Sequence, residues 1–256
     1  MTVRFSSLGS GSEGNALVVQ VGDSVLMMDC GFGLAETERR LARASLTPAD
    51  LDAIVVTHEH SDHIGGVARF ARKHNTPVWL THGTAKVWND DSLAPSLLRY
   101  VDPHEDFSIG DIRVTPFYVP HDAHEPVQYV FSDGAVRLGV LTDTGTITAH
   151  IESTLSGCEA LVLECNHDLD MLMNGTYPAS LKKRVAGRFG HLDNLTAASM
   201  LKNIDCRKLR HIFAAHLSKQ NNLPELASVA LADALSCAPD WIGIAGQENG
   251  FDWREI

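Results

Sequence analysis

The chain has 256 residues, a formal net charge of −11, and a composition of 44% hydrophobic and 21% charged residues. This composition is typical of a globular protein and excludes a disordered or fibrous one, while the negative charge excludes a protein that coats nucleic acid with its whole surface. We predict a single domain over residues 1–256, because α/β domains of this length often fold as one unit.

The N-terminal residues and the cysteines indicate the compartment. Residues 1–15 lack the charged start and apolar run of a secretory signal, and no stretch approaches the roughly 18 apolar residues of a spanning helix. The five cysteines are odd in number and widely spaced, which indicates reduced thiols rather than disulfides or a Cys-x-x-Cys metal site. We therefore expect a cytoplasmic protein that does not bind membranes, and the sequence leaves its oligomeric state open.

The expected elements form two blocks in which strands are followed by helices. The first block has strands at 15–21 and 24–29 around a Gly22-Asp23 turn, a helix at 36–44, a strand at 53–57 and a helix at 64–74. The second has three antiparallel strands within 112–143, strands at 160–163, 211–215 and 241–245, and helices at 178–189, 195–204 and 223–235. Two packed sheets with helices outside satisfy this pattern, because each sheet then has one face on a shared core.

A dense cluster of imidazoles and carboxylates follows the strand expected at 53–57. Residues 58–63 read His-Glu-His-Ser-Asp-His. These ligands suit a borderline or hard divalent ion such as zinc, manganese or iron, and alternate side chains at a strand end can converge on one point. We expect His58 and His60 to bind one ion and Asp62 and His63 to serve a second ion beside it. The alternative, a solvated polar loop, does not account for this density of histidine.

With this cluster the sequence resembles the metallo-β-lactamase superfamily. Its members carry Asp, His-x-His-x-Asp-His, His, Asp and His motifs at the ends of successive strands, and all five occur here in that order, the others being Asp29, His121, Asp143 and His216. The resemblance implies an α/β fold, the four-layer αββα metallo-β-lactamase sandwich, in which two mixed β-sheets pack face to face with helices outside.

The same resemblance implies two divalent metal ions, zinc or manganese. One ion would be held by His58, His60 and His121, and the other by Asp62, His63 and His216. Asp143 and a hydroxide would bridge the ions, and Asp29 would anchor the ligands from behind. His124 is an alternative to His121, which we favour because it directly follows a strand.

Two further segments, 161–168 and 190–194, resemble the Glu and Gly-His segments of phosphodiesterases such as the long-form tRNA-processing nucleases of the superfamily. There a His oriented by Glu protonates the leaving oxygen, so the resemblance implies these roles for Glu164 and His191, with Asp62 as the third catalytic residue. The shared hydroxide would attack phosphorus while the imidazolium supplies a proton to the departing alkoxide. Alternatively, Glu164 only ends a strand and His191 only packs at a helix start.

The match is closer still to the YycJ-type branch, small proteins regarded as exonucleases or related phosphodiesterases. The segments that carry it are 10–15, 121–126, 174–178, 190–192 and 216–222. This resemblance implies a 5′-to-3′ exonuclease whose partner is nucleic acid, DNA rather than RNA, or a small phosphodiester. Cys165 and Asp193 depart from the branch, where serine is expected, and Asp193 would add a negative charge beside a phosphate site.

Substrate contacts are predicted from charge, glycine and polar side chains. Residues 180–219 carry nine Lys or Arg against two Asp, so a nucleic-acid backbone is expected there, although two helices with ordinary basic faces give the same pattern. The glycine-rich segment 9–14 is either a phosphate cradle or a plain turn. Ser12, Asn15 and Asn221 are the predicted substrate-binding residues, though asparagine is also common in turns for local reasons.

Three hypotheses follow for the function. The first is a two-metal hydrolase that cleaves phosphodiester bonds, a nuclease. The second is a small-molecule hydrolase of thioesters, lactones or cyclic phosphodiesters, which the acidic net charge favours. The third, a binding or regulatory module, fits less well, because structural metal sites are closed and single whereas this one has ligands for two ions.

Overall fold

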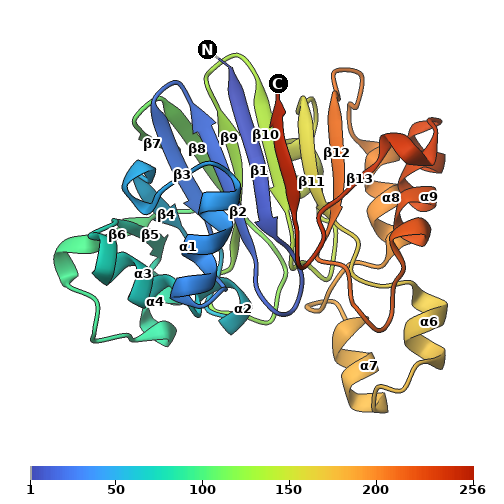
Figure 1. Ribbon diagram of the computed structural model, residues 1–256. Coiled ribbons are helices and arrows are strands. Elements are labelled where there is room, and N and C mark those ends of the chain that lie inside the picture. The colour runs from blue at the N-terminus through green and yellow to red at the C-terminus, as the bar shows by residue number, and fades with distance from the viewer. Residues whose placement is uncertain (1) are drawn as a thin grey trace.

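The computed structural model describes residues 2–256 and has two seven-stranded sheets packed face to face, with helices on the outer faces (Figure 1). In spatial order the first sheet comprises β14 (Phe251–Glu255), β1 (Val3–Gly9), β2 (Ala16–Val21), β3 (Ser24–Met28), β4 (Ala53–Val55), β5 (Val78–Thr81) and β6 (Leu98–Val101). The second comprises β13 (Gly243–Ile244), β12 (His211–Ala215), β11 (Ala160–Glu164), β10 (Arg137–Leu141), β9 (Val127–Ser132), β8 (Ile112–Tyr118) and β7 (Phe107–Ile109).

Both sheets are mixed, with an antiparallel half and a parallel half. Strands β3 to β6 are parallel to one another, as are β10 to β13, whereas the remaining pairs are antiparallel. Because parallel strands end at the same edge of a sheet, the loops after β3, β4, β10, β11 and β12 are brought to one end of the molecule. The expected αββα sandwich of two mixed sheets is confirmed.

The helices divide between the two outer faces and a projecting arm. The helices are α1 (Leu34–Arg43), α2 (Ser61–Ile64), α3 (Val67–His74), α4 (His82–Trp88), α5 (Ala149–Leu155), α6 (Leu169–Asn174), α7 (Ala179–Val185), α8 (Asn194–Asn203) and α9 (Pro224–Leu235), with 3₁₀ turns at Pro48–Asp50, Pro95–Leu97 and Pro239–Trp241. Helices α1, α3 and α4 lie by the first sheet and α8 and α9 by the second, while α6 and α7 extend away from the body (Figure 1). Among residues 2–256, no helix has both the length and the apolar character needed to cross a bilayer.

Three apolar layers hold this arrangement together. Strand β11 shows why, because Val162 faces the core between the sheets while Leu161 and Leu163 pack under α8 and α9. A strand covered on both faces needs an unbroken apolar run, which is what the sequence has here. Phe5 in the central layer packs edge-on against Phe213, with ring centroids 6.1 Å apart, which joins the two sheets.

Many expected elements occur in the structure. The differences are helices that are interrupted or end near glycines, and strands β1 and β14 of the first sheet, which were not expected. The hairpin of β2 and β3 across Gly22-Asp23 is antiparallel as predicted. The helix expected at 64–74 is instead α2 and α3, because the Gly65-Gly66 pair, which has low helix propensity, ends the first and begins the second. The helix expected at 178–189 ends at Val185. Strands β1 and β14 were not anticipated, since the Ser6-Ser7 pair interrupts the apolar pattern of β1.

Candidate metal centre

Strand ends from both sheets supply the polar side chains of one cluster. Asp29 follows β3, Asp143 lies two residues beyond β10, and His216 follows β12. All three have left-handed backbone conformations, with φ of 61°, 50° and 54°. Such conformations cost non-glycine residues about 1–3 kcal/mol each and concentrate at functional sites. Here each one turns a side chain out of its strand direction towards the cluster.

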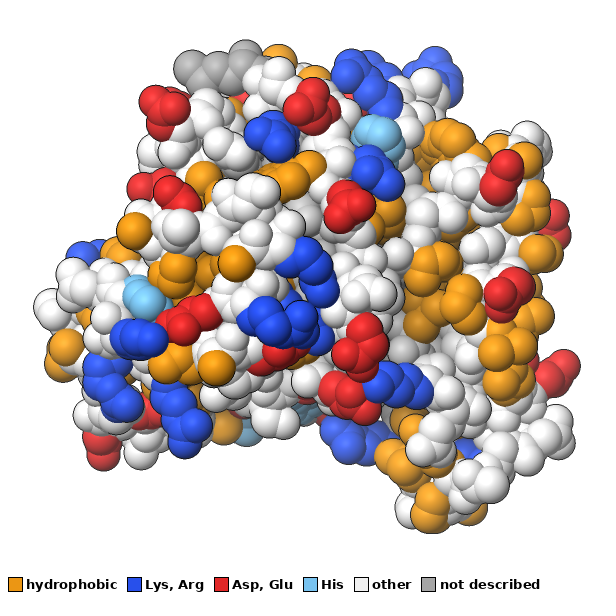
Figure 2. Space-filling model, in the orientation of Figure 1, with side chains coloured by type: hydrophobic (Ala, Val, Ile, Leu, Met, Phe, Trp, Pro, Cys, Tyr) orange, Lys and Arg blue, Asp and Glu red, His pale blue; other side chains and the backbone are white. Residues whose placement is uncertain are grey.

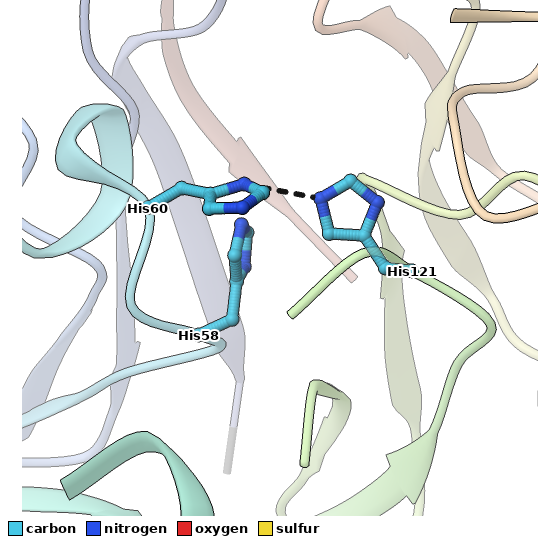
Figure 3. Close-up of side chains that lie close together, drawn as sticks. All are labelled: His58, His60 and His121. Carbon is cyan, nitrogen blue, oxygen red and sulfur yellow. Dashed lines mark hydrogen bonds between the residues drawn. The ribbon is translucent and has the colours of Figure 1, made fainter. Parts of the chain in front are cut away.

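Three histidines make up the first donor set. The rings of His58, His60 and His121 converge from two loops, with centroids 4.6–4.9 Å apart (Figure 3). His121 contacts the carbonyl oxygen of Gly190 through Nδ1 (3.1 Å), so its Nε2 faces His60 Nδ1 at 3.2 Å. One ligand atom from each of the three histidines lies within 4.8 Å of the others. His124, the alternative to His121, is 69% exposed and pairs with Glu59 at 3.1 Å, away from the set.

The second donor set adjoins the first. Asp62, His63 and His216 also place ligand atoms within 4.8 Å of one another. His63 Nε2 lies 3.5 Å from Asp62 Oδ2, which is 3.4 Å from His216 Nε2. Asp143 touches both sides, because its Oδ2 is 3.0 Å from His63 Nε2 and it groups with His58 and His63 as well. The seven predicted ligands therefore form two adjacent sets with Asp143 between them.

The chemistry of these donors fits divalent metal ions. His58 Nε2 is buried with no hydrogen-bond partner among the described residues, and leaving a buried polar atom unpaired costs roughly 1–3 kcal/mol. Asp143 Oδ2 is also buried, and His63 Nε2 lies beside it at 3.0 Å. Burial and the neighbouring His63 hold the pKa of His58 well below its usual value, so its imidazole is neutral, the form that binds metal. A cation here would give His58 Nε2 a partner and would balance the charge of Asp143.

Buried residues behind the ligands fix their orientation. Asp29 Oδ2 accepts from His63 Nδ1 at 2.8 Å, and its Oδ1 accepts from the amide of Thr57 at 2.9 Å, which leaves His63 Nε2 pointing into the cluster. Asn15 has a similar position, because its Nδ2 lies 3.2 Å from His63 Nε2 and 3.4 Å from Asp62 Oδ2. Asn15 was expected to bind substrate, but it lies buried beneath the ligands.

Glu164 and His191 form a hydrogen-bonded pair beside the metal-ligand candidates. Glu164 is fully buried, and its Oε2 accepts from the amides of Thr144 (3.0 Å) and Leu192 (3.3 Å). Its Oε1 lies 2.8 Å from His191 Nδ1. Burial by itself would lower the pKa of His191, but the charge of Glu164 and its hydrogen bond raise it to about 9, with Asp143 contributing. His191 is therefore held in one orientation and charged at neutral pH.

An open cavity of about 380 Å³ gives access to this cluster. Ser12, His60, Asp62, His191 and His216 are among its lining residues, so Ser12 lies where substrate would contact it. Asn221, the remaining predicted substrate-binding residue, is 2% exposed and absent from the lining. Its carbonyl oxygen accepts from the amide of Asp168 at 2.8 Å, which is a structural role.

The glycine-rich segment 9–14 is a turn between β1 and β2 rather than a free anion cradle. The Gly11 amide donates to Asn15 Oδ1 (2.8 Å), the Glu13 amide to Gln247 Oε1 (2.8 Å) and the Gly14 amide to the Gly11 carbonyl oxygen (3.1 Å). With these donors engaged inside the protein, few amides remain for a phosphate.

The two residues that depart from the YycJ-type pattern have structural roles. Asp193 precedes α8 and its Oδ1 accepts from the amides of Leu195 (2.9 Å) and Thr196 (3.0 Å), so its charge stabilises the helix start. Asp193 does not line the cavity, so the structure shows no contact through which its charge would repel a phosphate bound there. Cys165 is fully buried, and burial raises the pKa of its thiol.

Sequence reasoning assigned no role to several residues that the fold brings to the cavity. Asp122 lines it, with Oδ1 3.5 Å from His121 Nε2 and 3.9 Å from His60 Nε2. Tyr177 and Arg184 reach it from the arm of α6 and α7. Asp122 and Tyr177 lie in the segments 121–126 and 174–178, whose resemblance to the YycJ-type branch could have pointed to them. Arg184 is one of nine basic residues in 180–219, and nothing in the sequence distinguishes it from the others.

Comparisons with known proteins agree with this geometry. Residues 25–216 match the family described as "Beta-lactamase superfamily domain". The chain is 37% identical to exodeoxyribonuclease YycJ of Bacillus anthracis, over 92% of this chain and 90% of that protein. It is 31% identical to exodeoxyribonuclease WalJ of Streptococcus pneumoniae, over 94% and 91%. The fold is shared with the metallo-β-lactamase fold protein YhfI of Bacillus subtilis, at a TM-score of 0.76, 17% identity and full coverage of both chains.

A family match over most of the chain and a relative above 30% identity along nearly its whole length agree with the strand-end ligand cluster. The chain belongs to the metallo-β-lactamase superfamily, a family of metal-dependent hydrolases, and to its YycJ-type members.

Proposed function

We propose that this chain is a two-metal phosphodiesterase, a 5′-to-3′ exonuclease that acts on DNA, with the whole chain working as one hydrolase domain. The observation that carries the proposal is His191, which Glu164 orients at 2.8 Å beside the two donor sets at an open cavity. Cleaving a phosphodiester releases a basic alkoxide that needs a proton, and a charged imidazole at that position is suited to provide it. The exodeoxyribonuclease names of the YycJ and WalJ relatives support DNA as substrate.

The metal ions would be held by the two donor sets described above. His58, His60 and His121 would hold one ion, Asp62, His63 and His216 the other, with Asp143 shared between them. Zinc or manganese bound there would act as a Lewis acid and lower the pKa of water, which is the chemistry that hydrolysis of a phosphodiester requires. Asp29 and Asn15 hold His63 and Asp62 in position for this purpose.

The proton donor works through its two ring nitrogens. His191 Nδ1 donates to Glu164, so the opposite edge of the ring, with Nε2, faces the cavity that substrate would enter. Glu164 is itself held by two backbone amides and cannot rotate away. When a P–O bond breaks, the proton on Nε2 passes to the departing oxygen, and the neutral imidazole is stabilised in the same orientation for reprotonation.

The test is degradation of 5′-labelled and 3′-labelled DNA, in duplex and single-stranded form, with zinc or manganese. We expect metal-dependent release of label from the 5′ end first. Asp62→Ala should abolish cleavage, and His191→Ala should reduce it by about 10²–10⁴-fold, the usual contribution of a general acid. His150→Ala is the matched control, because His150 is exposed on α5 and outside the cavity.

The possible results separate the hypotheses. No cleavage of DNA by the parent protein in either metal, together with turnover of thioesters or lactones, would select the small-molecule hydrolase instead. Release of label from the 3′ end first would reverse the proposed polarity. Full activity in Asp62→Ala would refute the two-metal site.

A further inference from the structure

The arm of α6 and α7 differs in charge from the rest of the molecule. Residues 169–190, which include both helices, carry Lys182, Lys183, Arg184 and Arg188 against Asp170 alone, although the chain as a whole has a net charge of −11. The arm forms one wall of the cavity through Tyr177, Leu181 and Arg184. Figure 2 shows Lys and Arg side chains where the arm joins the body. Four basic residues and one acidic residue therefore lie in a segment that borders the cavity of an acidic protein.

The other basic residues of segment 180–219 do not share this position. Lys219 is neutralised by Glu13 at 2.7 Å, Arg207 by Asp205 at 2.7 Å, and Lys208 lies 3.9 Å from Glu159. Neither these three nor Lys202 and Arg210 line the cavity. Of the nine basic residues in the segment, Arg184 is the one that does.

Arg184 is the charged residue of the arm that lines the cavity. Its Nε donates to Asp122 Oδ2 at 2.6 Å, and the other oxygen of Asp122 is 3.5 Å from His121 Nε2. Only Nε is used in this way among residues 2–256, so both terminal nitrogens remain available, and the side chain is 60% exposed at the cavity. A guanidinium with two free donor nitrogens in fixed orientation matches the geometry of a phosphate.

The position of Arg184 is held by contacts between the end of the arm and the ligand loop. The Asp122 amide donates to the carbonyl oxygen of Phe189 at 3.0 Å, and His121 Nδ1 contacts that of Gly190 at 3.1 Å. These two contacts join the end of the arm to the loop that carries His121. Together with the bond from Arg184 to Asp122 they place Arg184 beside the metal-ligand candidates.

Tyr177 adds a flat surface on the same wall. It lies in the turn between α6 and α7, is partly exposed and lines the cavity. Nucleic-acid bases stack on aromatic side chains in single-strand binding sites, which contributes roughly 1–3 kcal/mol per base. Arg184 therefore provides a guanidinium for a phosphate, and Tyr177 provides a ring for a base.

We propose that the arm binds the polynucleotide strand beside the scissile bond, with Arg184 contacting the neighbouring backbone phosphate and Tyr177 stacking on a base. This inference rests on the proposed function and identifies the substrate as a chain with at least one phosphate next to the bond that is cleaved. A small phosphodiester lacks that phosphate.

The experiment compares two substrates for the metal-loaded protein, single-stranded DNA and bis(p-nitrophenyl) phosphate. We expect Arg184→Gln to lower kcat/KM on DNA by roughly 10- to 100-fold, the size of one charge-assisted hydrogen bond, and to change turnover of the small ester less than about threefold. The slope of log(kcat/KM) against log salt should become shallower by about one phosphate contact. Arg184→Lys, which keeps the charge but not the fork, should recover part of the loss.

Two further variants act as controls for stacking and for general charge. Tyr177→Ala should lose at least about fivefold on DNA only, and Tyr177→Phe, which keeps the ring, should recover most of that loss. Arg207→Gln removes an exposed, carboxylate-paired arginine of the same segment away from the cavity, and should change nothing.

The outcomes distinguish this inference from the proposed function. A parent protein inactive on both substrates would overturn the proposed function itself. An active parent whose DNA cleavage is unaffected by Arg184→Gln would overturn only the role of the arm. Equal losses on DNA and on the small ester, or a loss of bound metal, would show that Arg184 acts through Asp122 and His121, which also contradicts the inference.

Discussion

Replacing Glu164 by glutamine tests the proton donor without changing the shape of the site. Glu164 Oε2 accepts from two backbone amides and Oε1 accepts from His191 Nδ1. A glutamine keeps its oxygen on the amides and turns its NH₂ group towards Nδ1, which must then accept a hydrogen bond. The substitution therefore favours a neutral His191 and lowers its pKa.

The size of the effect follows from the pKa of His191. Burial opposes the charged imidazole, yet Glu164 raises the pKa from its ordinary 6.5 to about 9. At about pH 7.5 a group with that pKa is roughly 97% protonated, whereas one with a pKa of 6.5 or lower is at most roughly 10% protonated. In the absence of bound cations the substitution therefore lowers the protonated fraction of His191 by about tenfold at this pH, and we expect kcat on DNA to fall in the variant.

The direction of the pH dependence follows from the role of His191 as an acid. An acid catalyst must carry its proton, so activity is present below its pKa and is lost as the pH rises through it. Because the variant has the lower pKa, its activity should fall at lower pH than that of the parent. Bound cations lower the pKa of His191 in both proteins. The test is therefore the difference in pH between the two activity profiles rather than the position of either one.

The assay is kcat against pH for DNA and for bis(p-nitrophenyl) phosphate, whose weakly basic leaving group needs no proton. Glu164→Gln should impair the first reaction and spare the second. Thermal unfolding of both proteins checks that the variant is folded. Profiles that coincide, or equal losses on both substrates, would refute the assignment of His191 as the proton donor.

Three further predictions concern residues that support the site. Asp193→Ala should lower the free energy of unfolding by about 1 kcal/mol, because Asp193 caps α8, and Asp193→Ser should restore most of this loss. Thermal melts will measure both variants, and unchanged stability of Asp193→Ala would contradict the role of Asp193 as a cap. Asp29→Asn should weaken metal affinity by roughly 10- to 100-fold in a metal titration, because Asp29 orients His63, whereas parent-like affinity would remove it from that role. Gly31→Ala should prevent normal folding, because its Cβ would lie 1.8 Å from the carbonyl oxygen of Asp62; a parent-like melt would show that the chain can shift there.

Much of the fold was predictable because its strands are covered on both faces. The run Leu161-Val162-Leu163 is apolar at every position, as a strand between two layers requires, and it is β11 in the structure. Strand β1 was missed for the opposite reason. Its Ser6 is buried and bonds to the carbonyl oxygen of Phe251 at 2.8 Å, a partner 245 residues away that no local pattern indicates.

The metal ligands were also predictable, because they follow strands that end at one edge. His58 to His63 form one local motif, and Asp143 and His216 each follow an apolar strand of the parallel half-sheet. Their roles as ligands stay a prediction for the metal titration to test. Asn15 was predicted to bind substrate. A polar side chain beside a glycine-rich turn gives the same local sequence pattern whether it faces the substrate or the metal-ligand candidates.

By itself the sequence determined the ligand types, their order and the strands that carry them, because these depend on neighbours along the chain and on the period of each strand. Only the tertiary structure decided which side chains meet. It placed Glu164 of β11 against His191, buried Asn15 behind His63, and brought Arg184, alone among the basic residues of 180–219, to the cavity. Such choices depend on sheet register and on the packing of distant segments, which no window of sequence contains.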